Sequence, residues 1–82
     1  MSDNDDKYRP ISCADYDAYE IAIMHRERLR VTWHGDDGLE HIDTLSPRNL
    51  ETREHEEYLI ATSSQGGELR LRLDRILKAE RL

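Results

Sequence analysis

The sequence predicts a mainly β protein in which one short amino-terminal helix precedes about five short antiparallel strands. Three observations support this prediction: apolar residues at helical spacing over residues 13–26, alternating apolar and polar residues further on, and turn-forming clusters between those segments. The chain has 82 residues, which is enough for one domain with one modest core. Five strands of this size bury their inner faces most economically by curling into a barrel.

A start signal and a periodic stripe predict the helix. Ser12 can cap it, and Asp15 stands at the position of the acidic partner in a capping box. The apolar stripe that follows at helical spacing consists of Tyr16, Tyr19, Ala22 and Ile23, with Ile21 and Met24 beside it. The opposite face carries Asp17 and Glu20, so the helix is amphipathic.

The strands are predicted by period-two alternation and by the turns between them. Leu29, Val31 and Trp33 face one side of a first strand over residues 28–34, and the cluster Gly35–Gly38 turns the chain back. A less clearly patterned strand is expected at 39–45, and the breaker that begins at Ser46 predicts a loop over residues 46–56. The remaining strands are expected at residues 57–63, 68–74 and 75–82.

The chain is acidic, with a formal net charge of −6 and six of its eighteen acidic residues among the first twenty. Such a charge repels nucleic acid and favours encounter with a basic surface, so we expect no direct nucleic-acid binding. Residues 1–7 are expected to form a disordered acidic lead, followed by a single domain over residues 8–82.

Cysteine content and hydropathy indicate the compartment. The one cysteine, Cys13, excludes a disulfide within the monomer, fits a reducing compartment and is interpreted as a small buried thiol. The amino terminus is unlike a signal peptide, and no apolar run approaches the roughly 18 residues that a membrane span needs. We therefore expect a cytoplasmic protein with no membrane segment that is monomeric when free.

No constellation of catalytic or metal-binding residues stands out. The histidines lie in four different predicted elements without zinc-motif spacing, and are interpreted as solvated surface residues: His25, His34, His41 and His55. A glycine-rich phosphate loop and a nucleophile elbow are both missing. We expect no catalytic residue, no metal and no cofactor, and hence no enzyme.

Two charged surfaces are candidates for binding. The first is the acidic helix face of Asp15, Tyr16, Asp17 and Glu20, whose simpler interpretation is helix capping plus a solvated face. The second is a set of outward arginines on two strands, Arg28, Arg30, Arg70 and Arg72. These arginines form either an RNA-binding stripe or cross-strand ion pairs, and they lack the interleaved exposed aromatics of single-strand binders.

Residues 8–22 contain the pattern Tyr-x-Pro-Ile-x-Cys-x-Asp-Tyr-Asp, which begins at Tyr8 and is followed by Glu20 and a small residue. In this pattern the chain resembles the Rof family, the bacterial Rho-binding antiterminators. Weaker similarity continues through Glu57-Tyr58-Leu59, Glu68-Leu69-Arg70-Leu71 and Leu73-Asp74-Arg75-Ile76. The resemblance therefore spans nearly the whole chain.

This resemblance implies an amino-terminal helix on a small Sm-like barrel. It also implies binding to the hexameric transcription termination factor Rho, whose primary RNA-binding site the protein blocks by imitating RNA, inhibiting Rho-dependent termination. The family's contact aspartate corresponds to Asp15, and Asp17 and Glu20 also match. Ala14 departs from relatives that carry an acid there, and no contact is transferred to residues 46–56, a longer and more acidic segment here.

Overall fold

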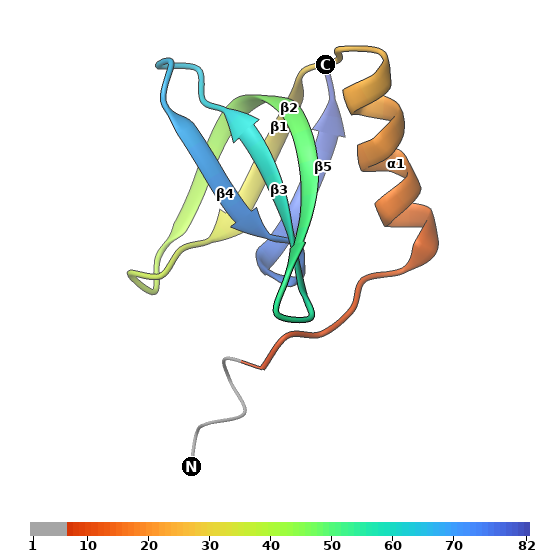
Figure 1. The fold of residues 1–82 in the computed structure, drawn as a ribbon. Helices are drawn as coiled ribbons and strands as arrows, with labels where there is room; N and C mark the ends of the chain where they lie inside the picture. The colour runs from red at the N-terminus through yellow and green to blue at the C-terminus, as the bar shows by residue number, and fades with distance from the viewer. Residues whose placement is uncertain (1–6) are drawn as a thin grey trace.

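The structure, a computed structural model, describes residues 7–82 and consists of one helix and five strands (Figure 1). Apart from Lys7, the acidic lead expected at residues 1–7 lies outside the described residues. The elements follow the chain as α1 (Cys13–Met24), β1 (Leu29–His34), β2 (Glu40–Arg53), β3 (Glu56–Thr62), β4 (Glu68–Arg72), the 3-10 turn η2 (Leu73–Arg75) and β5 (Ile76–Arg81).

The five strands form one antiparallel sheet in the order β4-β3-β2-β1-β5. The predicted mainly β class, the helix and the five antiparallel strands are confirmed. The expected Sm-like barrel is not, because β4 and β5 remain two separate edges and no pairing closes the sheet within residues 7–82. Instead, η2 turns the chain away from β4, and β5 pairs with β1 at the far side of the strand order.

β2 is the longest strand and belongs to both halves of the curved sheet (Figure 1). Residues 40–45 pair with β1, and residues 46–53 pair with β3. The register shifts between Pro47 and Asn49, so that Arg48 is the extra residue of a β-bulge. Proline lacks an N–H and is tolerated within a sheet mainly at edges and bulges. The prediction of a loop over residues 46–56 is therefore wrong, because the breaker residues bend a continuous strand instead of ending it.

The hairpin between β2 and β3 closes through only two residues, Glu54 and His55. Arg53 pairs with Glu56 on either side of the turn, and φ is 53° at Glu54 and 69° at His55. Positive φ at both central residues is the geometry of a type I′ turn, whose twist matches that of the flanking strands. Because Asn-Gly and Asp-Gly are the usual residues there, the hairpin could not be predicted from Glu-His.

The core forms where α1 packs against the sheet. Its buried residues come from the helix, from four strands and from η2: Tyr19, Ala22, Leu29, Val31, Leu45, Leu59, Ala61, Leu71 and Leu73. The inward positions predicted on the first strand are confirmed for Leu29 and Val31, and Trp33 is half-buried against the same cluster. Burial of these side chains is the main stabilising term for so small a domain.

Substitution at the β2–β3 turn tests this hairpin. The double variant Glu54→Asn with His55→Gly should raise the free energy of unfolding by about 1 kcal/mol, because these residues adopt positive φ at less cost. Urea denaturation measures the change. The control His55→Ala retains a Cβ and should give no gain. A loss of stability in the Asn-Gly variant would contradict the two-residue turn.

Candidate partner-binding surface

The start of α1 is fixed by hydrogen bonds to Ser12. The Ser12 hydroxyl accepts a hydrogen bond from the backbone N–H of Asp15 at 3.1 Å, and its carbonyl accepts one from Tyr16 at 3.1 Å. The predicted cap is therefore confirmed. Such a cap satisfies N–H groups that have no partner within the helix, and it holds the first turn in place. Asp15 lies in that turn, where its charge also complements the helix dipole.

Three carboxylates on α1 face solvent. Asp15, Asp17 and Glu20 are exposed, and none of them makes an ion pair with another residue in the range 7–82. The last turn of the helix also carries no basic residue. The negative charges of these three carboxylates are therefore not neutralised by a neighbouring side chain, and a cationic partner can approach them from solvent.

The other side of α1 anchors it to the core. Tyr19 and Ala22 are buried, and Tyr16 and Ile23 are half-buried against the same cluster. Burial raises the pKa of Tyr19 to about 12, with a smaller contribution from the charge of Asp15. Tyr16, which was predicted to join the partner-binding face, thus packs partly inward. Desolvation raises its pKa first, and the charges of Glu57 and Glu20 raise it further.

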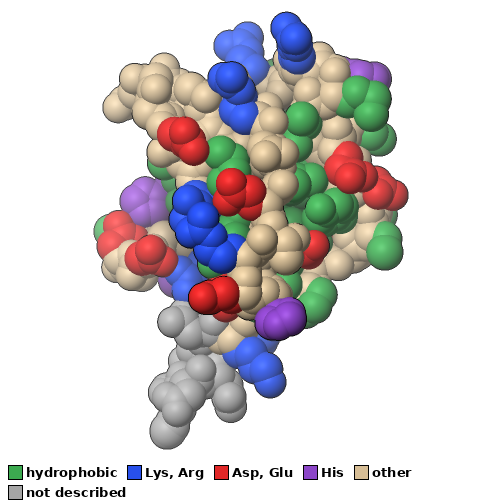
Figure 2. All heavy atoms as spheres, in the orientation of Figure 1, with side chains coloured by type: hydrophobic (Ala, Val, Ile, Leu, Met, Phe, Trp, Pro, Cys, Tyr) green, Lys and Arg blue, Asp and Glu red, His purple; other side chains and the backbone are tan. Residues whose placement is uncertain are grey.

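Two large apolar residues of α1 are exposed beside the acids. Ile21 has 47% of its surface exposed and Met24 has 73%. Figure 2 shows hydrophobic and acidic side chains next to one another on the side where α1 lies in Figure 1. Ile21 and Met24 were placed beside the apolar stripe in the sequence, but their exposure depends on which face the helix turns to the sheet. The outer side of α1 therefore combines the acids Asp17 and Glu20 with these two apolar residues.

The structure does not gather the four outward arginines into one patch. Arg28 and Arg30 are exposed at β1, whereas Arg70 and Arg72 lie on β4, which β2 and β3 separate from β1 in the strand order. Arg72 donates hydrogen bonds from Nε and Nη2 to Asp74 at 2.7 and 3.1 Å, and also lies 3.7 Å from Glu56. At Arg72 the interpretation as an ion pair with neighbouring acids is confirmed.

Cys13 and one histidine, His41, occupy different environments from those expected. Cys13 is exposed in the first turn of α1, so its interpretation as a buried thiol is wrong: the turn points it away from the sheet. His41 is half-buried rather than solvated, since its ring stacks on Trp33 with centroids 5.5 Å apart. The other three histidines are exposed, as expected.

Neither a metal site nor a membrane-spanning helix is found among the described residues. Within residues 7–82, no three His, Cys, Asp or Glu side chains are placed so that they could hold a metal ion together. Over the same residues, no helix has the length and apolar character required to cross a membrane.

The fold and the acidic helix define a small helix-and-sheet protein with an exposed, negatively charged surface. Residues 10–82 match the family described as "Modulator of Rho-dependent transcription termination (ROF)". The chain belongs to this family, which confirms the resemblance of its sequence to the Rof family. It is 36% identical over 72 residues to Protein rof of Escherichia coli (strain K12) and to Protein rof of Shigella flexneri, covering 87% of this chain and 79% of each relative.

A solved structure shares the fold at low sequence identity. A chain of the proteasome accessory factor B/C (PafBC) of Arthrobacter aurescens superposes with a TM-score of 0.76 and 20% identity. The similar region covers 93% of this chain and 12% of that chain. At this identity the likeness shows a common fold and no common function.

The burial of Tyr19 predicts how alkali affects the docking of α1. Its pKa is raised from 10.0 to about 12 in the folded protein, so the unfolded chain loses the proton first. Burial of the neutral Tyr19 therefore stabilises the fold fully below about pH 10. As the pH rises toward 12, the free energy of unfolding falls by up to about 2 kcal/mol.

The variant Tyr19→Phe has no proton to lose at this position. Urea denaturation between pH 9 and 12 should therefore show a shallower loss of stability than in the wild type, because the raised pKa of Tyr19 no longer contributes to the pH dependence. Identical slopes in the two proteins would show that Tyr19 is not buried against the sheet.

Proposed function

We propose that this protein binds transcription termination factor Rho through α1 and blocks the primary RNA-binding site of Rho, thereby inhibiting Rho-dependent termination. Membership of the family supports the involvement in Rho-dependent termination. The observation that carries the binding mode is the set of three exposed carboxylates on α1, which lack ion-pair partners among residues 7–82.

The electrostatics support competition with RNA. A site that binds a polyanion has a positive potential, and carboxylates held on a docked helix can occupy it in place of phosphates. Because α1 is capped and packed on the core, its acids lose little conformational freedom on binding, which favours affinity. In this proposal Asp15, Asp17 and Glu20 stand in for the charges of a transcript.

The exposed apolar side chains complete the proposed contact. Ile21 and Met24 each lie one helical turn after an acid, Asp17 and Glu20 respectively. Burial of such side chains at the centre of an interface excludes water, and the surrounding charge pairs then fix orientation. The proposed surface is therefore mixed: carboxylates for cationic groups of Rho and an apolar edge for a less polar part of it.

The proposed action requires no bond-making step and no cofactor. It places the protein in the cytoplasm, free as a monomer until it meets Rho. The alternative, RNA binding by the outward arginines, has less support, because the sheet separates Arg28 and Arg30 from Arg70 and Arg72 and ion pairs hold Arg72.

Charge reversal on α1 tests the proposed contact. Asp15→Lys and Asp17→Lys should each weaken binding to Rho by about tenfold at low ionic strength, because each replaces an attraction by a repulsion. Isothermal titration with purified Rho measures the dissociation constant, and a melting profile confirms the fold of each variant.

The matched control is Glu68→Lys, the same charge change at an exposed position on β4. It should weaken binding much less, because only the long-range attraction is reduced. Equal losses in all three variants would mean that net charge, and not the α1 surface, governs the affinity.

Blocking of the RNA site makes a separate prediction. Wild-type protein should displace a labelled pyrimidine oligonucleotide from Rho, with a displacement midpoint that rises in proportion to the oligonucleotide concentration. Fluorescence anisotropy of the label measures this competition. A ternary complex, in which Rho retains the oligonucleotide while saturated with this protein, would contradict the blocking mechanism and leave Rho binding itself intact.

A further inference from the structure

A cleft away from α1 lies between the β1–β2 turn and the β4–η2 segment. One hollow of about 620 Å³ is lined by residues that include Trp33, Tyr58 and Arg70. A second hollow adjoins it, and the two share five lining residues: His34, Gly35, Asp36, Arg72 and Arg75. Clefts of this volume accommodate small-molecule ligands.

The cleft is rich in positive charge although the protein as a whole is acidic. Its two hollows are lined by five Lys and Arg residues and three aspartates: Lys7, Arg9, Arg70, Arg72 and Arg75, with Asp36, Asp37 and Asp74. Arg72 is held by Asp74 and Glu56, with only 10% of its side chain exposed. Arg70 makes no ion pair within residues 7–82 and lies 6.0 Å from the ring centre of Tyr58. The guanidinium of Arg70 is therefore available to pair with an anionic ligand.

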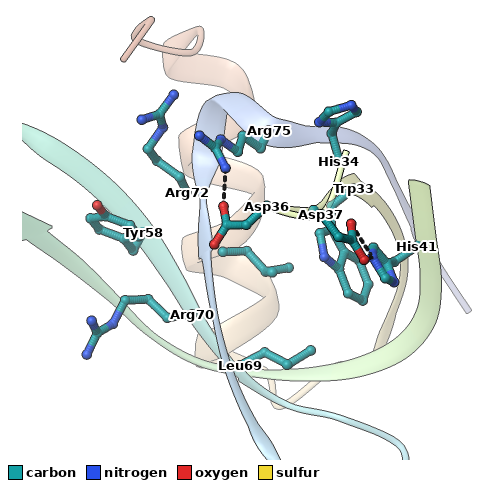
Figure 3. A pocket seen from close by; sticks show the side chains of 12 residues that line it. Trp33, His34, Asp36, Asp37, His41, Tyr58, Leu69, Arg70, Arg72 and Arg75 are labelled. Carbon is teal, nitrogen blue, oxygen red and sulfur yellow. Dashed lines mark hydrogen bonds and ion pairs between the residues drawn. The ribbon is translucent and has the colours of Figure 1, made fainter. Parts of the chain in front are cut away.

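Arg75 is paired with an acid whose side chain is almost fully exposed to solvent. Its guanidinium binds the carboxylate of Asp36, which lies in the turn after β1 (Figure 3). The side chain of Asp36 is 96% exposed, whereas that of Arg75 is 25% exposed. An exposed ion pair of this kind contributes little stability. An incoming anion can therefore replace the Asp36 carboxylate on Arg75 at small cost, while Arg75 stays in place.

Aromatic rings stand on both sides of this ion pair. In Figure 3, Tyr58 and Arg70 lie on one side and the stacked pair of Trp33 and His41 lies on the other. His41 is fixed in turn, because its Nε2 lies 3.0 and 3.1 Å from the two carboxylate oxygens of Asp37. Planar rings beside guanidinium groups suit a ligand that carries a phosphate next to an aromatic base.

From this geometry we propose that the cleft binds a small nucleotide, with its phosphate on Arg75 in place of Asp36 and its base against the aromatic walls. A small ligand fits better than a long strand, because the net charge of −6 repels a polyanion over distance. The proposed site is separate from α1 and does not rest on the binding of Rho.

The only tryptophan of the chain, Trp33, reports on this cleft directly. Titration with mononucleotides bearing each of the four RNA bases, at low ionic strength, should change Trp33 fluorescence to saturation for at least one of them. Isothermal titration with the same nucleotides confirms the stoichiometry. Inorganic phosphate and a single-stranded oligonucleotide of the preferred base are titrated in parallel.

Two substitutions should change the affinity for the nucleotide in opposite directions. Arg75→Gln removes a charge-assisted hydrogen bond to the phosphate and should weaken binding about tenfold or more. Asp36→Asn removes the competing carboxylate and should strengthen binding by about threefold to tenfold. The matched control Arg30→Gln removes the same charge as Arg75→Gln from an exposed position outside the cleft, and should have little effect.

Several outcomes would overturn this proposal. The absence of a saturable response to any mononucleotide would overturn it. Binding of inorganic phosphate as tight as that of a nucleotide would also overturn it, because the cleft would then be a simple anion site. Tighter binding of the oligonucleotide than of its mononucleotide would exclude the assignment to a small ligand. Weaker binding by Asp36→Asn would show that Asp36 contacts the ligand instead of competing with it.

Discussion

The docking of α1 on the sheet through Tyr19 and Ala22 is the contact on which the rest of the molecule depends. A helix of 12 residues is marginal in isolation, so its order comes from the buried face and from the cap at Ser12. Once that face is committed to the core, the direction of every other side chain on the helix is fixed. Asp17, Glu20 and Met24 then lie on the side of the helix away from Tyr19 and Ala22, where they are exposed to solvent.

The distribution of charge divides the molecule into two kinds of surface. On α1 the carboxylates have no cationic neighbour within residues 7–82, and their field extends into solvent, where salt screens it. On β4 and η2 the cations Arg72 and Arg75 are paired with aspartates, so the positive charge is largely held within the cleft. The acids of α1 are therefore left without a neutralising neighbour among the described residues, whereas Arg72 and Arg75 are neutralised by aspartates.

Local patterns predicted the elements of this fold well, and global geometry was harder to predict. The cap at Ser12 and the alternation through Leu29 and Val31 are signals carried by adjacent residues, and both are confirmed. The loop expected at residues 46–56 is a strand with a bulge and a tight turn, because pairing with β3 outweighs the local preferences of a proline and of two residues at positive φ.

The candidate surfaces also differ in how far the sequence alone predicted them. Helical spacing groups Asp17 and Glu20 on one face without tertiary information, whereas Asp15 was identified by the capping box and by the resemblance to the family. The exposure of Cys13 and Met24 depends on the angle at which α1 meets the sheet, which spacing does not determine. The cleft joins β1 to β4, which are separated by two strands in the sheet order, and no sequence pattern indicates that Trp33 and Arg70 line one cavity.

The most direct test of the α1 surface is backbone hydrogen exchange of this protein, measured by mass spectrometry with and without Rho. Binding through α1 predicts slower exchange in peptides from residues 13–24 of the complex, and unchanged exchange over residues 68–75. Slower exchange confined to the β4–η2 segment, with residues 13–24 unaffected in a saturated complex, would contradict the claim that the helix carries the interaction.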